Sequence, residues 1–397
     1  MSQNPFVVSL LLFFLILTLY LFSKNEKTKR IYQFLPLPFW CYFVPTVLAS
    51  LKIIPYDLPL YSAIGRLFLP TCLFFLLIGT DLKTLFSVKS QSLLAMVYGS
   101  IGILVGGLFT YGLALKFLPT LWQEELWKGW GALSATWTGG SANMLAIKEI
   151  TNISPSLFSN LIVTDTFVAY LWMAFLVYLS KYQNKLDAWL KAKPMEIPAE
   201  ETSKSSSALI HKSYTQSLFE TFFLLAVAFL CGSFFLYVSH WMPSLGSLIT
   251  GFTWTVILAT LIPLFLSQTP VKRLEQFGAS SIGQFLLYLM LASIGARANL
   301  AHLGDAPLFI LLGIIWALVH GLILLLLGRV SRIPLSLLAT SSQANIGGTI
   351  SAPIVASLYS KNLTSIGVLL ATLGNIFGTY LGLLFSEVCR SILDLLK

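Results

Sequence analysis

The sequence predicts an all-α polytopic membrane protein made of two inverted repeats that contain interrupted helices. Three observations lead to this fold class: an apolar composition, two sets of six apolar segments, and basic loops that change parity between the halves. The 397 residues are 56% hydrophobic and only 10% charged, with a mean hydropathy of +0.80. Because a soluble domain has about 25% charged residues, this composition excludes a soluble enzyme.

The formal net charge of +9 could suggest a nucleic-acid partner, but the positions of the basic residues argue against one. Lys and Arg lie mostly in short loops between apolar segments, which the positive-inside rule predicts for an inner-membrane protein. The four cysteines are scattered through apolar segments, and no Cys/His pattern with metal-ligand spacing occurs. We therefore expect a multi-pass protein of the inner membrane that binds no nucleic acid.

The first apolar segment covers residues 6–22 and is followed at once by Lys24, Lys27, Lys29 and Arg30. A cleaved signal peptide has its positive charges before the apolar run and a small-residue cleavage site after it. Because the order is reversed here, we expect a retained first helix. Its N-terminus should lie outside the cell and its basic flank in the cytoplasm.

Eleven further apolar segments follow along the chain. They lie at residues 34–52, 60–79, 91–117, 129–147, 157–180, 217–239, 246–268, 280–298, 306–328, 334–358 and 362–389. The one long polar stretch separates the sixth segment from the seventh. We predict a first transmembrane repeat over residues 1–180, a cytoplasmic hydrophilic linker over 181–216, and a second repeat over 217–397.

Short matches in the same order relate the two halves. They pair Ile78-Gly79 with Ile294-Gly295, Ala135-Thr136 with Ala339-Thr340, and Asp165, Phe167 and Tyr170 with Asn375, Phe377 and Tyr380. Each match is weak alone, but three in one order indicate an internal duplication.

The basic loops predict that the repeats are inverted. They follow the first and third segments in one half, and the eighth and tenth in the other; the later loops contain Lys83, Lys89, Lys272, Arg273, Arg329 and Arg332. A change from odd to even positions reverses the orientation of the second half. Five segments separate the first basic loop from the cytoplasmic linker, where an even number of crossings is required. We expect the fifth segment, and by symmetry the eleventh, not to cross simply.

The fifth and eleventh segments are also where we expect substrate to bind. Residues 134–143 and 339–351 are rich in Gly, Ser, Thr and Asn, unlike a helix that faces lipid. Glycine pairs let a helix break where protein or water covers the freed backbone groups. Half-helix N-termini suit an anionic group, and a matched pair of interrupted segments indicates a midplane transport site. The expected substrate-binding residues are Thr136, Thr138, Ser141, Ser342 and Gln343.

Asp165 is the one acidic residue near the middle of an otherwise apolar segment. An ionisable group there is a functional candidate, because it can coordinate Na⁺ or carry a proton. We expect a cation site of Asp165, Asn143, Asn345 and Asn375, with no other metal.

Purely structural interpretations exist for both features. The small residues could be packing stripes between helices, and Asp165 could be a buried acid that neighbouring hydroxyls satisfy. Packing alone does not explain the amide side chains of the two segments, which need partners in an apolar environment.

The two halves, the interrupted segments and Asp165 together resemble the superfamily of cation–proton antiporters and bile-acid-type sodium symporters. Within it, residues 134–143 and the stretch 78–83 look like the YjcL-like family of uncharacterised membrane proteins. The resemblance implies crossing, broken helices in a mobile core domain, a scaffold of the other helices, and elevator-like transport. It departs in one respect: Thr164 precedes Asp165, where electrogenic sodium–proton antiporters have a second Asp.

The expected function is secondary active transport of a small carboxylated solute (an amino acid, short peptide or organic acid), coupled to Na⁺ or, as the less favoured ion, H⁺. A sodium–proton antiporter without an organic substrate is the alternative. An enzyme is disfavoured because no segment holds a catalytic His/Asp/Glu cluster or Ser/His arrangement, and broken repeats favour alternating access over a channel. We expect no cofactor, and as partners the substrate, Na⁺, membrane lipid and a second copy in a homodimer.

Overall fold

The structure is a computed structural model, and the regular secondary structure of its described residues is helical. It describes residues 4–28, 31–32, 35–82, 84, 90–193, 214–245, 249, 251–298, 300–360 and 363–397, without the side chains of 214–221, 228, 301 and 302. No β-strand occurs within these ranges. Most of the predicted linker, residues 194–213, lies outside them, as do Lys29, Arg30, Lys83 and Lys89.

Seven helices of the described ranges are long and apolar enough to cross a membrane. An eighth span is formed if α13 (Gly251–Leu266) and η1 (Pro270–Phe277), which meet at 102°, count as one bent segment. Length alone allows about ten to twelve spans. The number is lower because α3 (Leu37–Ser50) and α14 (Ala279–Gly295) have only 14 and 17 residues, and because two segments are broken. The chain is a multi-pass membrane protein.

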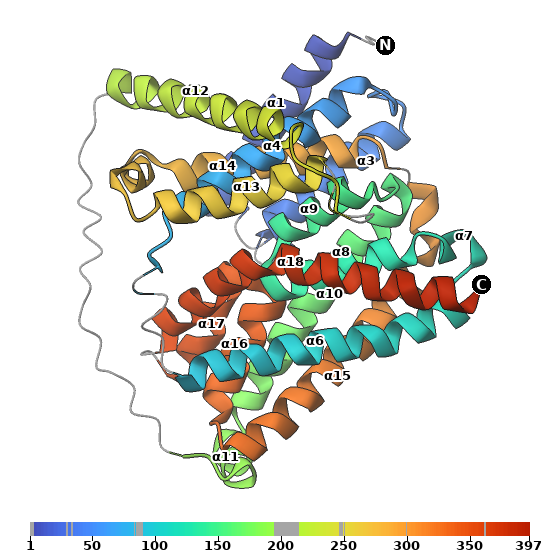
Figure 1. Ribbon diagram of the computed structural model, residues 1–397, viewed down its shortest axis with the longest axis vertical. Coiled ribbons are helices and arrows are strands. Elements are labelled where there is room, and N and C mark those ends of the chain that lie inside the picture. Colours follow the sequence, from blue (N-terminus) through green and yellow to red (C-terminus); the bar gives the residue numbers. More distant parts are fainter. Residues whose placement is uncertain are drawn as a thin grey trace.

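The helices form two groups, which occupy the upper and lower parts of Figure 1. The panel group contains α1 (Pro5–Lys24), α3, α4 (Pro59–Ile78), α12 (Tyr214–Ser239), α13 and α14. The hairpin group contains α6 (Ser90–Phe117), α8 (Leu126–Gly139), α9 (Ser141–Thr151), α10 (Pro155–Ser180), α15 (Ala306–Ser331), α16 (Leu335–Ile346), α17 (Gly348–Tyr359) and α18 (Thr364–Leu396). Three short helices lie between the longer ones: α7 (Thr120–Gln123) between α6 and α8, α11 (Gln183–Leu190) after α10, and η2 (Leu300–Asp305) between α14 and α15. Each group takes helices from both halves of the chain.

Within the panel group, the two halves make reciprocal contacts. Helix α1 packs on α3 and α14, whereas α12 packs on α13 and α4. Helix α3 also packs on α14, as α13 does on α4. The three panel helices of one half therefore have the same neighbours as those of the other half, with the halves exchanged.

The fifth apolar segment is a hairpin of α8 and α9, broken at Gly140. Its φ of +86° is accessible to glycine and strained for other residues. Gly129, near the start of α8, lies against Leu157 and Leu161 in the first turns of α10. The end of α9 joins the start of α10 through residues 152–154 alone. Both ends of this hairpin are therefore at the face where α10 begins.

The eleventh segment is a second hairpin, of α16 and α17, broken at Gly347 and Gly348. The φ of Gly348 is +71°. The backbone N–H of Leu335 donates to Asp187 of α11 at 2.7 Å, and the hydroxyl of Tyr359 donates to the carbonyl of Leu176 at 2.7 Å. Both contacts lie where α10 ends. The second hairpin thus enters from the face opposite to the first.

The tips of the two hairpins meet inside the hairpin group. A Cβ atom at Gly348 would lie 4.0 Å from the Cα of Gly140. Each hairpin thus turns back toward the face from which it enters; the charge count favours such a return, whereas the family resemblance implies crossing helices. We call the face where α1, α10 and α15 end the basic face, because Lys24, Lys27, Arg329 and Arg332 lie there.

Small residues hold α8 and α18 in close contact. Gly131, Ala135 and Gly139 repeat every four residues on α8, and Gly374, Gly378 and Gly382 do so on α18. A Cβ atom at Gly382 would lie 3.0 Å from the carbonyl oxygen of Gly131. Such stripes let two backbones approach within a membrane, where dispersion contacts replace the hydrophobic effect as the driving force.

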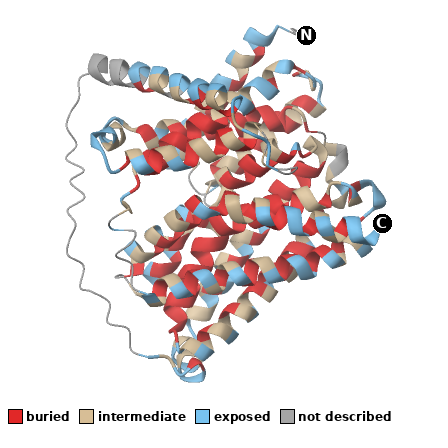
Figure 2. Cartoon of the chain, in the orientation of Figure 1, coloured by how far each residue is buried: buried red, intermediate tan, exposed pale blue. Residues whose placement is uncertain are grey.

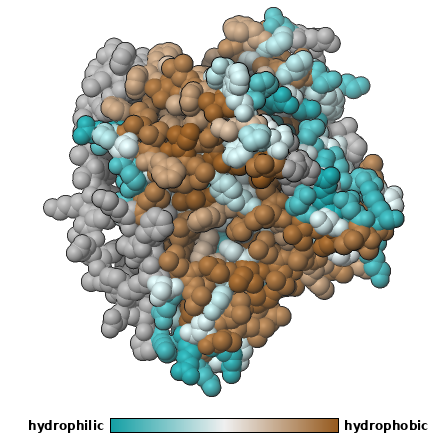
Figure 3. All heavy atoms as spheres, viewed as in Figure 1, coloured by the Kyte–Doolittle hydropathy of each residue, from teal (hydrophilic) through white to brown (hydrophobic). Residues whose placement is uncertain are grey.

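The outer surface is apolar over the middle of the molecule. Figure 3 shows hydrophobic residues across most of the described part of this face, with hydrophilic residues gathered around α11 and near α7. Large exposed apolar side chains include Phe14 on α1, Phe109 on α6 and Leu230 on α12. Buried residues fill both helix groups (Figure 2). An apolar exterior over a packed interior fits a bilayer environment.

Candidate functional site

A cavity of about 520 Å³ lies between the panel group and the tips of the two hairpins. The panel group contributes residues of α1, α3 and α14, and the hairpin group contributes residues of α8, α9, α10, α16 and α17. Lys24, which is exposed at the end of α1, and Pro36 and Leu37 at the start of α3 also line it. The cavity therefore opens at the basic face.

Asp165 lines the cavity from α10 and is held in place by a rigid donor. The indole Nε1 of Trp137 donates to Asp165 Oδ1 at 2.8 Å, and Thr136 is a second hydrogen-bonding neighbour of the carboxyl group. Trp137 is fully buried and packs edge-to-face on Trp316, with ring centroids 4.9 Å apart. A carboxylate has about four acceptor sites, so these contacts leave room for a cation. No basic side chain pairs with Asp165 within the described ranges.

The hairpin tips place two helix N-termini at the cavity. Helix α9 begins at Ser141 and α17 at Gly348, and the cavity is lined by Gly140, Ser141, Gly347 and Ser351. The first backbone N–H groups of a helix have no intrahelical partner and carry positive partial charge. Two such ends at one cavity favour an anionic group there.

Gln343 adds an unused acceptor to the same wall. Its Nε2 donates to the hydroxyl of Ser351 at 2.8 Å, whereas its buried Oε1 has no hydrogen-bond partner among the described residues. A buried amide oxygen without a partner is costly unless a ligand or a water molecule completes it. Gln343 is thus poised to accept a hydrogen bond or to coordinate a cation.

Four of the nine predicted site residues line the cavity: Thr136, Ser141, Gln343 and Asp165. The other five do not. The hydroxyl of Thr138 donates to the backbone carbonyl of Ser134, one turn earlier in α8, at 2.8 Å. Ser342 accepts a 2.8 Å hydrogen bond from Trp172 Nε1 and lies 2.8 Å from His320 Nε2, behind the second hairpin.

The three predicted amide ligands lie on the far sides of the hairpins. Asn143 Nδ2 donates to the Gly139 carbonyl at 2.6 Å, and Thr379 donates to Asn143 Oδ1. Asn345 Nδ2 donates to the Ser341 carbonyl at 3.2 Å, and Ser100 donates to Asn345 Oδ1 at 3.2 Å. Asn375 borders the first hairpin tip, with Oδ1 3.1 Å from where a Cβ of Gly140 would lie. These amides surround the tips instead of joining Asp165.

Sequence reasoning missed the panel side of the cavity. Tyr20, Lys24, Gln284 and Tyr288 line it from α1 and α14, but these helices look like ordinary apolar segments in the sequence. A polar Gln within α14 is the one signal that could have indicated this wall. Within the described ranges, no cluster of three or more His, Cys, Asp or Glu side chains has the geometry of a metal site.

Comparison with known proteins places the chain in a family. The family described as "Protein of unknown function (DUF819)" matches residues 11–392, nearly the whole chain. The chain belongs to the DUF819 family. It is also similar to the uncharacterized membrane protein YjcL of Bacillus subtilis (strain 168), with 25% identity over 349 residues that cover 85% of each protein. Both findings support the expected likeness of the chain to YjcL-like membrane proteins.

Proposed function

We propose that the chain is a secondary active transporter of a small carboxylated organic solute, coupled to Na⁺ and less favourably to H⁺. The observation that carries this proposal is the cavity between two helix groups, where two opposed hairpin tips meet beside Asp165. Opposed re-entrant segments at mid-depth are the arrangement that transporters use to bind substrate and ion together.

The chemistry of the cavity supports an anionic substrate. The N-termini of α9 and α17 and the hydroxyls of Ser141 and Ser351 offer donors to a carboxylate. An amino acid, a short peptide or an organic acid carries such a group and fits within about 520 Å³. Lys24 at the mouth adds positive charge to the entrance.

Asp165 supplies the charge for the coupling ion. Na⁺ prefers oxygen ligands, and the carboxylate of Asp165 lies on the same cavity as the Thr136 hydroxyl and the unused Gln343 Oε1. A half-buried carboxylate without a basic partner among the described residues also favours a bound cation in the membrane interior. The same group favours a second candidate, a sodium–proton antiporter that carries no organic substrate.

The proposal includes an elevator-like movement of the hairpin group against the panel group. The reciprocal contacts in the panel group and the entry of the hairpins from opposite faces favour inverted repeats. Inverted repeats suit the cation–proton antiporter and bile-acid symporter superfamily. We further propose the inner membrane as the location, the basic face as the cytoplasmic one, and a homodimer. The proposal contains no catalytic step and no cofactor.

The test is thermal unfolding of the purified protein with carboxylated metabolites, amines and neutral sugars, with and without Na⁺. A ligand at about 100 times its Kd stabilises a protein by about 2.7 kcal/mol, which raises the melting temperature by several degrees. Of these compounds, we expect only the carboxylated metabolites to stabilise the protein. Their effect should be larger when Na⁺ is present. Asp165→Asn should abolish the response to Na⁺, whereas Asp57→Asn, an exposed control, should retain it.

Two outcomes contradict parts of the proposal. Stabilisation only by cationic or neutral compounds would exclude a carboxylated substrate. A Na⁺ response that survives Asp165→Asn would place the cation site elsewhere. Na⁺ stabilisation without any organic ligand, together with Na⁺/H⁺ exchange in proteoliposomes, would support the antiporter instead.

A further inference from the structure

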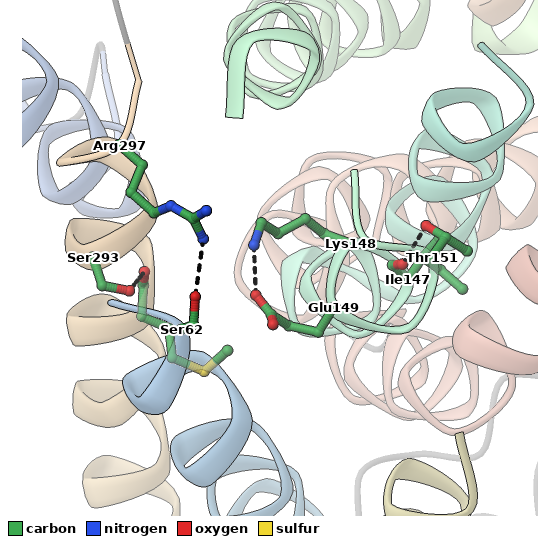
Figure 4. Close-up of polar contacts among 8 residues, drawn as sticks. Ser62, Ile147, Lys148, Glu149, Thr151, Ser293 and Arg297 are labelled. Carbon is green, nitrogen blue, oxygen red and sulfur yellow. Dashed lines mark hydrogen bonds and ion pairs between the residues drawn. The ribbon is translucent and has the colours of Figure 1, made fainter. Parts of the chain in front are cut away.

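The face opposite the cavity mouth carries a charged contact between the two helix groups. Lys148 and Glu149, in the last turn of α9, pair with 2.5 Å between Nζ and Oε1, and their side chains are 6% and 12% exposed. Figure 4 shows this pair facing Arg297, just after α14, and Ser62 in the first turn of α4. Arg297 Nη1 donates to Ser62 Oγ at 3.3 Å.

Gly65 of α4 makes room for this contact. A Cβ atom there would lie 2.9 Å from both Cδ and Oε1 of Glu149. A larger residue must therefore displace the Glu149 carboxylate from its place against α4. This closure lies at the end of α14 and the start of α4, whereas the cavity opens at the start of α14 and the end of α1. The hairpin and panel groups are thus closed together on one face and parted on the other.

The charges at this closure are suited to an interface that separates. A buried ion pair adds little to a permanently packed contact, because desolvation offsets much of its attraction. Lys148 pairs with its own neighbour on α9, and no ion pair among the described residues joins either side chain to α4 or α14. Both charges would be well solvated if water entered between the two helices. Apolar side chains would stabilise a permanently closed interface better than these charges do.

We propose that the contact of Lys148 and Glu149 with α4 closes a second access path to the cavity, on the face opposite the basic face. This inference rests on the proposed transport function. When the hairpin group moves, α9 leaves α4 and the path opens. Lys148 and Arg297 then become two cations at an entrance, where they attract a carboxylated substrate toward the hairpin tips.

The first test opens the path by steric pressure. A cysteine replaces Ser141 at the hairpin tip, in a background with Cys231→Ala. Its labelling reports from which face of the membrane a thiol reagent can reach the cavity. We expect a membrane-impermeant maleimide to label it from the basic face. Gly65→Val should raise the labelling rate from the opposite face by about tenfold, as expected for a shift between two states. Gly112→Val is the matched control, because a Cβ at Gly112 meets no atom within 4 Å.

The second test locks the path. Replacing Lys148 and Glu149 together by Met removes the charges and keeps an unbranched side chain of similar length. An apolar contact should hold α9 on α4, so labelling from the opposite face should fall below the level of the parent protein. The half-buried ion pair of Glu125, just before α8, and Lys128 on α8, replaced in the same way, is the control.

The outcomes separate this inference from the proposed function. Unchanged labelling in a correctly folded Gly65→Val protein, or increased opposite-face labelling in the double Met variant, would overturn the closure. Stabilisation of the parent protein by carboxylates and Na⁺ is measured separately, and its absence would overturn the proposed function. The closure stands only if the two variants change the labelling in opposite directions.

Discussion

At the scale of single residues, the hydrogen bonds around His320 fix its form. Its Nδ1 lies 3.0 Å from the Gly99 carbonyl, which can only accept, so Nδ1 carries the proton. Its Nε2 lies 2.8 Å from Ser342 Oγ, which already accepts a hydrogen bond from Trp172 Nε1. Ser342 therefore donates to Nε2, and a neutral imidazole satisfies every partner. His320 links α6, α15 and α16 and supports the second hairpin from behind.

This network predicts a structural effect of removing His320. His320→Phe removes the acceptor for the Ser342 O–H and a donor to the Gly99 carbonyl. An unsatisfied buried donor costs about 1–3 kcal/mol. We expect a lower unfolding midpoint of the purified protein. His240→Phe, at an exposed position, should leave the midpoint almost unchanged. Equal midpoints for the two variants would show that the network contributes nothing.

Helical geometry explains which of the predicted site residues line the cavity. Successive residues on a helix are separated by about 100°, so Ser141 and Asn143 lie on nearly opposite sides of α9. Because Ser141 lines the cavity, Asn143 faces α18. The composition of the segment identified the hairpin tip but not its rotation, since that depends on packing against α18. Asp165 was identified because a charge stands out in an apolar segment.

At the scale of elements, the hairpins follow from two features of the sequence. Glycine pairs allowed the breaks, and the even number of crossings between basic loops required segments that return to the same face. The apolar segments gave the long helices to within a few residues; α10, for example, starts at Pro155 and was expected from 157. The pairing of panel with hairpin helices could not be read from the sequence. It depends on contacts between segments that are uniformly apolar.

The glycine stripe between α8 and α18 predicts the sensitivity of one position. A Cβ at Gly378 would lie 2.7 Å from Asn143 Nδ2 and 2.9 Å from the Ala135 carbonyl oxygen. Because a backbone atom cannot easily move, Gly378→Ala should destabilise the protein by about 1–3 kcal/mol, as overpacking does. Gly112→Ala, in open space, is the control for thermal unfolding. A Gly378→Ala protein as stable as the control would mean that the two helices can separate without loss.

At the scale of the whole molecule, the two faces differ in how they are closed. The basic face holds the cavity mouth, and the opposite face holds the contact of α9 with α4. A protein with one open and one closed side has the shape that alternating access requires. The division into two helix groups was expected only from the family resemblance, because composition is similar in both groups.

The orientation of these faces can be measured. The basic loops predict that residue 206, outside the described ranges, is cytoplasmic. A cysteine in place of Ser206 should therefore remain unlabelled by an impermeant thiol reagent in intact cells. A cysteine in place of Asp57, at the start of α4, should be labelled under the same conditions. The reverse pattern would invert the orientation proposed for the whole chain.

The column of tryptophan rings has an optical consequence. The ring of Trp316 stacks with that of Trp130 at 6.2 Å and meets that of Trp137 edge-on, so the three indoles absorb as a coupled chromophore. Trp137 also donates to Asp165, so a cation arriving there changes the electric field at one end of this chromophore. We expect Na⁺ to shift the tryptophan emission and the near-ultraviolet circular dichroism of the unlabelled protein. Trp137→Phe should remove that shift among the ten tryptophans, so the native chain would report on the proposed ion site.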